Sequence, residues 1–253
     1  YIDRGDLEGL KSVLREAPEF ASRAISWGIP QCTAPPIHYL SDGYFNCRWD
    51  HELEGPMARL MIDAGAPVEG PPDPGGTHLH GAASLGCLAV AKVLVEYGAD
   101  IEAKGAYPGI PVGTPLDFAV HFGMVEIVDL LVKRGAKIRT ARMAAGTGSL
   151  DTLKKQLASL DGNINEEVTD AFRCAVVCDR VNVVDYMLNS GISVDDTIDG
   201  GTALHWAAWE AKPEMVRYLL TRGADPARLD AKHKMKPLDW ARHRRKEIGP
   251  RSE

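Results

Sequence analysis

Apolar residues recur along the chain in short blocks that have the spacing of amphipathic helices. In the clearest block, Leu204 and Ala207 are followed by Val216 and Leu219, which fit one face of each of two consecutive helices. The block opens at Thr202 and closes at a Gly-Ala pair. The closing position recurs along the chain at Gly65-Ala66, Gly98-Ala99, Gly135-Ala136, Gly191-Ile192 and Gly223-Ala224. This pattern predicts pairs of helices that repeat along the chain, and a repeat has to be recognised before any single element is assigned.

The closing glycines are separated by 33, 37, 56 and 32 residues. Three of these intervals lie near the roughly 33-residue period of ankyrin repeats, and the longest leaves room for one more, shortened unit. The openings are also alike, as in Thr77-His78-Leu79-His80, Thr114-Pro115-Leu116-Asp117 and Thr202-Ala203-Leu204-His205. Over nearly its whole length the chain therefore resembles the ankyrin family. The resemblance implies an all-α repeat solenoid of stacked helix-turn-helix units with β-hairpin or loop fingers, about seven units including partial caps.

These landmarks divide the sequence into a single ankyrin-repeat domain over residues 1–253. We expect the following units: a partial N-terminal repeat at 1–30, a repeat with an insertion at 31–67, repeats at 76–101 and 113–138, a degenerate repeat at 140–160, repeats at 168–194 and 201–226, and a C-terminal cap at 235–249. The insertion, 41–55, contains Tyr44, Phe45, Trp49 and His51. A longer connector at 105–113 should extend one finger. Between the helices of a unit, Gly86 and Gly123 allow a turn with positive φ; Asp179 is a tolerable replacement, whereas Ala211 should change how its helices are joined.

Composition is that of an ordinary folded protein, with 45% hydrophobic and 25% charged residues. The sequence has no apolar run long enough to cross a membrane, and its net charge of −6 argues against a nucleic-acid surface. Five cysteines without a Cys-x-x-Cys pair favour a reducing, cytoplasmic location. Cys174 and Cys178 are four residues apart on an expected helix; we interpret them as small buried side chains, with metal ligands as the alternative. We expect no membrane partner, no nucleic acid and a monomer.

Chemical motifs are almost absent. The sequence lacks the phosphate-loop, zinc-protease, nucleophile-elbow and dinucleotide-binding signatures, so we predict no catalytic residue, no cofactor and no metal site. The Thr-x-Leu-His opening has a structural role: Thr satisfies N–H groups at the helix start and Leu reaches the core. By resemblance to the family, His38, His80 and His205 bond between neighbouring repeats. Asp117 and Asp239 occupy the same place and can bond to backbone.

The resemblance also implies where a partner would bind, since ankyrin arrays use the fingertips and the exposed side of the first helices as a concave strip. The candidate partner-binding residues are Asp73, Leu85, Tyr107, Ile110, His121, Phe122, Val177, Ile198, Asp199, Trp209 and Glu210. Exposed large aromatics are common anchors of interfaces, which singles out Trp209 and Phe122. Both residues have an alternative role in packing, with Trp206 or Trp240 as the neighbour of Trp209.

Two functions follow from these observations. The main hypothesis is a non-enzymatic adaptor that binds a protein through the concave face. The alternative is a scaffold recruited for small-molecule binding or catalysis in a groove near the 41–55 insertion and the 105–113 finger. The basic run from Arg242 to Lys246 is interpreted as a solvated cap helix, with a nuclear address or nucleic-acid patch as the other reading.

Overall fold

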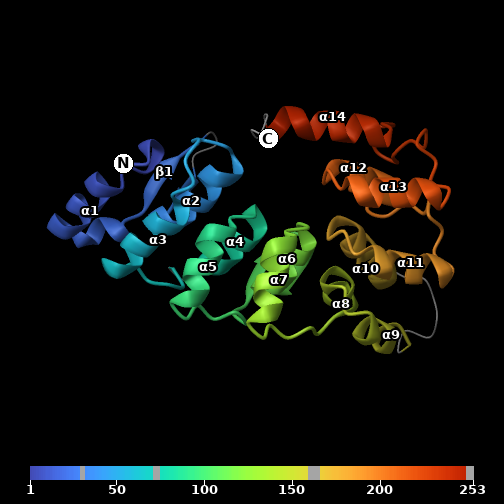
Figure 1. Ribbon diagram of the computed structural model, residues 1–253, viewed down its shortest axis with the longest axis horizontal. Coiled ribbons are helices and arrows are strands. Elements are labelled where there is room, and N and C mark those ends of the chain that lie inside the picture. The colour runs from blue at the N-terminus through green and yellow to red at the C-terminus, as the bar shows by residue number, and fades with distance from the viewer. Residues whose placement is uncertain (29–31, 71–74, 159–165, 249–253) are drawn as a thin grey trace. The chain divides into compact units, whose positions relative to one another are not determined.

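The computed structural model describes residues 1–28, 32–70, 75–158 and 166–248. In these ranges the regular secondary structure is almost all helical, with only short two-stranded hairpins besides, so the predicted all-α repeat architecture is confirmed. The chain divides into two compact units, unit 1 at Tyr1–Ala119 and unit 2 at Val120–Glu253. Each consists of helix pairs stacked in sequence order (Figure 1).

Unit 1 contains two layers of helices and two hairpins. Its elements are the 3₁₀ turns Ile2–Arg4 and Pro18–Ala21, helices α1 (Leu7–Glu16), α2 (Pro36–Phe45), α3 (Glu54–Asp63), α4 (His78–Leu85) and α5 (Leu88–Glu96), and strands β1 (Ile25–Trp27), β2 (Cys32–Ala34), β3 (Gly105–Tyr107) and β4 (Ile110–Gly113). Helix α2 packs on α4, while α3 lies between α1 and α5. Fully buried side chains such as Leu40, Met57, Leu79 and Leu94 fill the space between the layers.

The insertion and the extended finger both lie in unit 1. Helix α2 runs on to Phe45, and residues 46–53 then lead to α3, whereas only two residues separate α4 from α5. The finger is the antiparallel hairpin β3–β4, in which Tyr107 pairs with Ile110. The hairpin leads directly into α6 (Pro115–His121).

Unit 2 continues the alternation of first and second helices. Its helices are α7 (Val125–Lys133), α8 (Ala141–Thr147), α9 (Leu150–Ala158), α10 (Glu166–Val177), α11 (Val181–Asn189), α12 (Ala203–Trp209), α13 (Pro213–Thr221) and α14 (Pro237–Ile248). Helix α10 packs between α8 and α12, and α12 packs on α14. A continuous core runs through these layers from Ala144 by way of Phe172 to Leu219.

The turns between paired helices share one backbone conformation whatever residue occupies them. Gly86 and Gly148 have φ of 76° and 79°, and Asp179 and Ala211 have 56° and 51°. The expectation that Ala211 changes the joint is therefore wrong. Ala211 instead adopts the left-handed conformation, which is unfavourable for a residue with a Cβ atom.

The role of the motif histidines is confirmed for two of the three. The Thr77 backbone N–H donates to Nδ1 of His80 (3.0 Å), which leaves Nε2–H to donate to the carbonyl oxygen of Gly113 (3.3 Å). His205 makes the same contacts, with Thr202 N at 3.1 Å and the Met235 carbonyl at 3.0 Å. In each case one imidazole caps its own helix and reaches the following repeat. Such histidines are structural, because both ring nitrogens are in use.

Candidate functional site

Three first helices contribute to a polar cluster in unit 2, the guanidinium cluster, formed by His121 at the end of α6, Arg142 at the start of α8, and Asp170 and Arg173 in α10. Arg173 is only 4% exposed; its Nη2 lies 2.8 Å from Asp170 Oδ1 and its Nη1 donates to the carbonyl oxygen of His121 at 3.2 Å. Arg142 Nη1 lies 3.4 Å from the other oxygen of Asp170. Two guanidinium groups thus share one carboxylate, which leaves the cluster with an excess of positive charge.

His121 is held neutral within this cluster. Its Nδ1 faces Nη2 of Arg173 (3.1 Å) and Nη2 of Arg142 (3.3 Å), so it acts as an acceptor. Burial, with the charges of Arg173 and Arg142 acting in the same direction, lowers the pKa of His121 to about 4. At neutral pH the histidine therefore adds no charge and serves to fix the two arginines.

The first helices α8, α10, α12 and α14 pack in succession. Between the last two of them, α12 and α14, lies an apolar hollow, the tryptophan groove. The groove has a volume of about 410 Å³ and is lined by Trp206, Trp209, His233, Met235, Trp240 and His243. The Trp240 ring meets Trp206 edge-on with centroids 5.2 Å apart, and Trp209 edge-on at 5.9 Å. The Arg173 guanidinium lies 5.5 Å from the Trp206 ring centroid and joins the groove to the guanidinium cluster.

Asp230 fixes the loop that forms one wall of the groove. The buried carboxylate accepts hydrogen bonds from the backbone N–H of Lys232 (2.9 Å), His233 (2.6 Å) and Met235 (2.8 Å), and from Nε1 of Trp240 (3.1 Å). Burial by itself raises the pKa of Asp230, but these hydrogen bonds together outweigh burial and hold the pKa well below its usual value. The groove wall is therefore held by an ionised carboxylate.

Trp209 makes the packing contact that the sequence offered as one reading, and it also keeps part of its side chain accessible. Its ring packs edge-on against Trp240, and the Arg244 guanidinium lies 5.1 Å from its centroid, yet the side chain remains half-buried and lines the groove. The neighbouring residue Glu210 is also half-buried, at the end of α12. The structure thus places Trp209 in the lining of a defined hollow.

Five of the other candidate residues have accessible side chains: Leu85, Tyr107, His121, Phe122 and Asp199. Of these, Tyr107 is 45% exposed. Phe122 packs edge-on against His121, with ring centroids 4.9 Å apart. Asp73 lies outside the described residues. In the finger, Val112 is 70% exposed, and sequence reasoning missed it because strand register was not assigned.

Three candidates are buried and present no side chain to a partner: Ile110, Val177 and Ile198, which are 3%, 1% and 3% exposed. Ile110 turns inward against Gly113, where a Cβ atom would lie 2.4 Å from Ile110 Cγ2. Val177 packs at the Gly123 turn. Ile198 bridges to Gly201, and its carbonyl accepts the Trp206 indole N–H at 2.8 Å. Their inclusion as exposed contacts was wrong because the expected helix ends and fingertips did not specify which side chains face the core.

Trp49 and His51 of the 41–55 insertion are used for packing. Trp49 stacks on His51 with the ring planes 10° apart, and its Nε1 donates to the buried carboxylate of Glu54 at 2.7 Å. Gly43 makes room for the indole, since a Cβ atom there would lie 2.0 Å from Trp49 Cη2. The ligand-pocket alternative stays a prediction, but Trp49 and His51, two of the residues that suggested it, are engaged with each other.

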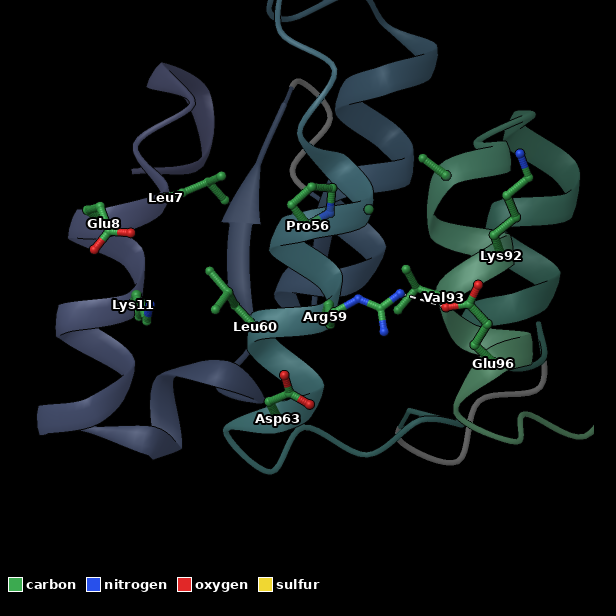
Figure 2. Close-up of a pocket in the computed structure, with 12 residues that line it drawn as sticks. Leu7, Glu8, Lys11, Pro56, Arg59, Leu60, Asp63, Lys92, Val93 and Glu96 are labelled. Carbon is green, nitrogen blue, oxygen red and sulfur yellow. Dashed lines mark hydrogen bonds and ion pairs between the residues drawn. The ribbon is translucent and has the colours of Figure 1, made fainter.

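A second hollow of about 550 Å³ lies on the second-helix layer of unit 1, along α1, α3 and α5 (Figure 2). Arg59 extends from α3 to Glu96 on α5, where Nη2 and Oε2 are 2.6 Å apart. Lys11 and Lys92 alternate with Glu8 and Asp63 around it. Charges of both signs and an ion pair between neighbouring repeats are typical of a solvated outer surface, so this hollow does not resemble a selective ligand site.

Cysteines and carboxylates do not assemble into a metal centre in the described part of the chain. Cys174 and Cys178 are buried as small side chains, and burial raises the pKa of the Cys178 thiol above its usual value. Among the described residues, no group of three or more His, Cys, Asp or Glu could hold a metal ion. Likewise, none of the described helices is long and apolar enough to cross a bilayer.

Comparisons with known proteins bear on both units. One family model, ankyrin repeats in three copies, matches residues 141–230, and a model of ankyrin repeats in many copies matches residues 79–132; together they cover more than half of the chain. A relative from Caenorhabditis elegans, ankyrin repeat and KH domain-containing protein mask-1, is 28% identical over 184 residues, which are 71% of this chain and 7% of that protein.

Another relative, ankyrin repeat, SAM and basic leucine zipper domain-containing protein 1 of Nomascus leucogenys, is 46% identical over 61 residues, or 24% of this chain and 13% of that protein. The chain thus spans a small part of each relative's length. Among solved structures, the human ASB11 ankyrin repeat domain aligns with 84% of this chain and 99% of that one at 24% identity, with a TM-score of 0.38.

Proposed function

Because the chain belongs to the ankyrin-repeat family, whose repeats are generally protein-protein interaction modules and typically non-enzymatic, we propose that it is an adaptor that binds a partner protein through its first helices. The observation that carries the proposal is the tryptophan groove. Three indole rings from two adjacent repeats surround an open hollow, although a solenoid needs only small or aliphatic residues to stack.

Aromatic side chains that are packed on one side and open on the other are typical anchors of protein interfaces. Trp209 has this arrangement, because Trp240 supports it and the groove lies beside it. The guanidinium cluster continues the same surface on α8 and α10. Tyr107 and Leu85 are further accessible candidates, in unit 1.

Affinity purification from the native source, followed by mass spectrometry, would identify the partner. The purified partner would then be tested against the wild type and Trp209→Ala, Phe122→Ala and Tyr107→Ala. We expect Trp209→Ala to weaken binding at least about tenfold. Leu220→Ala is the control, because Leu220 is 43% exposed on the second helix α13 and lies outside the groove. A partner that all three variants bind as tightly as the wild type would remove the proposed surface.

A further inference from the structure

The rim of the tryptophan groove is strongly basic in a chain whose net charge is −6. Between residues 230 and 245 there are six Lys and Arg residues against two Asp. Asp230 accepts four hydrogen bonds from the loop and Trp240, and Asp239 faces Arg242 at 3.6 Å. These bonds stabilise the charge of Asp230 without removing it, and Glu210 beside Trp209 is a further acidic residue. The segment that supplies His233, Met235, Trp240 and His243 to the groove still has more cationic than anionic side chains and therefore an excess of positive charge.

Cationic groups also lie over two of the groove's rings. Arg244 lies over Trp209 and Arg173 over Trp206, with guanidinium carbon to ring centroid distances of 5.1 and 5.5 Å. An aromatic cage for a cation, such as a methylated lysine, needs ring faces that are open to the ligand and a neutral or acidic rim. Here an incoming cation would meet like charges, which makes a basic ligand unfavourable.

The ring geometry is less suited to a run of stacked nucleic-acid bases than to a single bulky side chain. Trp206 and Trp209 are inclined to Trp240 by 86° and 77°, so Trp240 does not form a parallel platform with either of them, of the kind on which single-stranded nucleic acids stack successive bases. The hollow of about 410 Å³ is compact, near the lower end of the roughly 300–1,000 Å³ of ligand pockets. Its size and apolar lining suit one or two bulky side chains.

Apolar lining and basic rim together define the ligand chemistry. We infer that the tryptophan groove binds an acidic segment of a partner protein, in which a bulky apolar or aromatic side chain enters the groove and flanking Asp or Glu residues pair with the Lys and Arg rim. The inference rests on the proposed function and specifies the partner's chemistry. In this arrangement Lys232 and Lys236, both exposed on the loop before α14, face the acidic flanks.

Isothermal titration calorimetry of the full chain with three synthetic peptides would test the inference. The probe peptide has a central Leu-Phe pair flanked by Glu residues. One matched peptide replaces every Glu with Lys, and the other replaces Leu-Phe with Ser-Gly. We expect the probe to bind with a Kd at least about tenfold lower than either matched peptide, and its affinity to fall with added salt because the charges at the rim are screened.

Two variants locate the binding. Trp209→Ala should weaken the probe at least about tenfold, and the double variant Lys232→Glu, Lys236→Glu should weaken it while improving the lysine peptide. Leu220→Ala should leave both affinities unchanged. Circular dichroism of each variant checks that the fold is retained, and if Trp209→Ala does not fold, Trp209→Phe replaces it in the same titrations.

Other outcomes separate the inference from the proposed function. If the purified partner depends on Trp209 but the lysine peptide binds as tightly as the probe, the inference fails and the adaptor function stands. Tighter binding of a single-stranded oligonucleotide than of the probe would also overturn the inference. A partner that ignores Trp209 removes the proposed surface itself, whatever the peptides do.

Discussion

Two aromatic clusters distinguish this protein from a plain array of repeats, and they use the same residue types in opposite ways. In unit 1, Trp49 stacks on His51, bonds to Glu54 and occupies the space above Gly43. In unit 2, Trp209 is supported by Trp240 but lines an open groove. An aromatic residue at a non-repeating position is therefore not by itself a sign of function. What matters is whether its neighbours fill the space around the ring.

The largest effect should come from removing the packed aromatic. Trp49→Ala should destabilise unit 1 by about 3–5 kcal/mol, because it leaves a cavity and strips the buried Glu54 carboxylate of its donor. Urea unfolding followed by circular dichroism measures the change. Val112→Ala, at a position of β4 that is 70% exposed, is the control and should stay within about 0.5 kcal/mol. A Trp49→Ala loss as small as that of the control would break the contrast between the clusters.

In unit 2, the stability of the tryptophan groove should depend more on the Asp230 carboxylate than on any single indole. Asp230→Ala removes the acceptor of four hydrogen bonds, so we expect a loss of about 2–3 kcal/mol and a disordered wall around Met235. Because the pKa of Asp230 is lowered in the fold, its contribution is present above pH about 4 and is lost as pH falls further. Hydrogen exchange at residues 231–235 would measure the disorder of the wall in Asp230→Ala and, as a function of pH, the loss of the carboxylate's contribution. Asp230→Asn, which carries no carboxylate, is the comparison for the pH dependence. Unchanged protection in Asp230→Ala would show that the wall is held by other contacts.

A milder acid effect is expected from His121. Its pKa is lowered to about 4, against about 6.5 in an unfolded chain, so the unfolded state takes up a proton first as pH falls. Its contribution is thus complete above pH about 6.5 and is lost between there and pH about 4, on the order of 1 kcal/mol given the partly exposed ring. Scanning calorimetry of the wild type and His121→Asn across this range checks the prediction. Parallel pH profiles for both proteins would contradict it.

The smallest effect concerns the turn directly after Trp209. Ala211→Gly relieves the left-handed strain at φ 51° but adds freedom to the unfolded chain, so we expect a gain below about 1 kcal/mol. Gly86→Ala, the reverse change in the equivalent turn of unit 1, should cost about 1–2 kcal/mol. The urea midpoints of Ala211→Gly and Gly86→Ala, each compared with that of the wild type, test both predictions. If both changes have the same sign, the two turns are not equivalent.

The sequence was sufficient for the fold because the Thr-x-Leu-His openings and Gly-Ala closings encode local contacts, as the bonds of His80 and His205 show. It also located Trp209, since a large aromatic at an inter-helix position departs from the repeat. The guanidinium cluster was missed because Arg142 and Arg173 contact His121 only when neighbouring repeats stack on each other. Arg142 lies in the degenerate repeat, where the repeat period does not show which residues of adjacent repeats are equivalent. Asp230 was missed for a related reason, because it acts on a loop that has no recurring pattern.

All five tryptophans of the chain belong to the two aromatic clusters. In unit 1, Trp27 meets the Tyr39 ring edge-on, with centroids 4.9 Å apart, and Tyr39 in turn meets Trp49 edge-on at 5.7 Å. The other three, Trp206, Trp209 and Trp240, lie in unit 2. Each unit thus contains its own optical reporter. Replacing the two indoles of unit 1 with Phe would leave ultraviolet emission from unit 2 alone, and replacing the other three would do the reverse. The same molecule can therefore reveal whether its two halves melt together or in turn, without any attached dye.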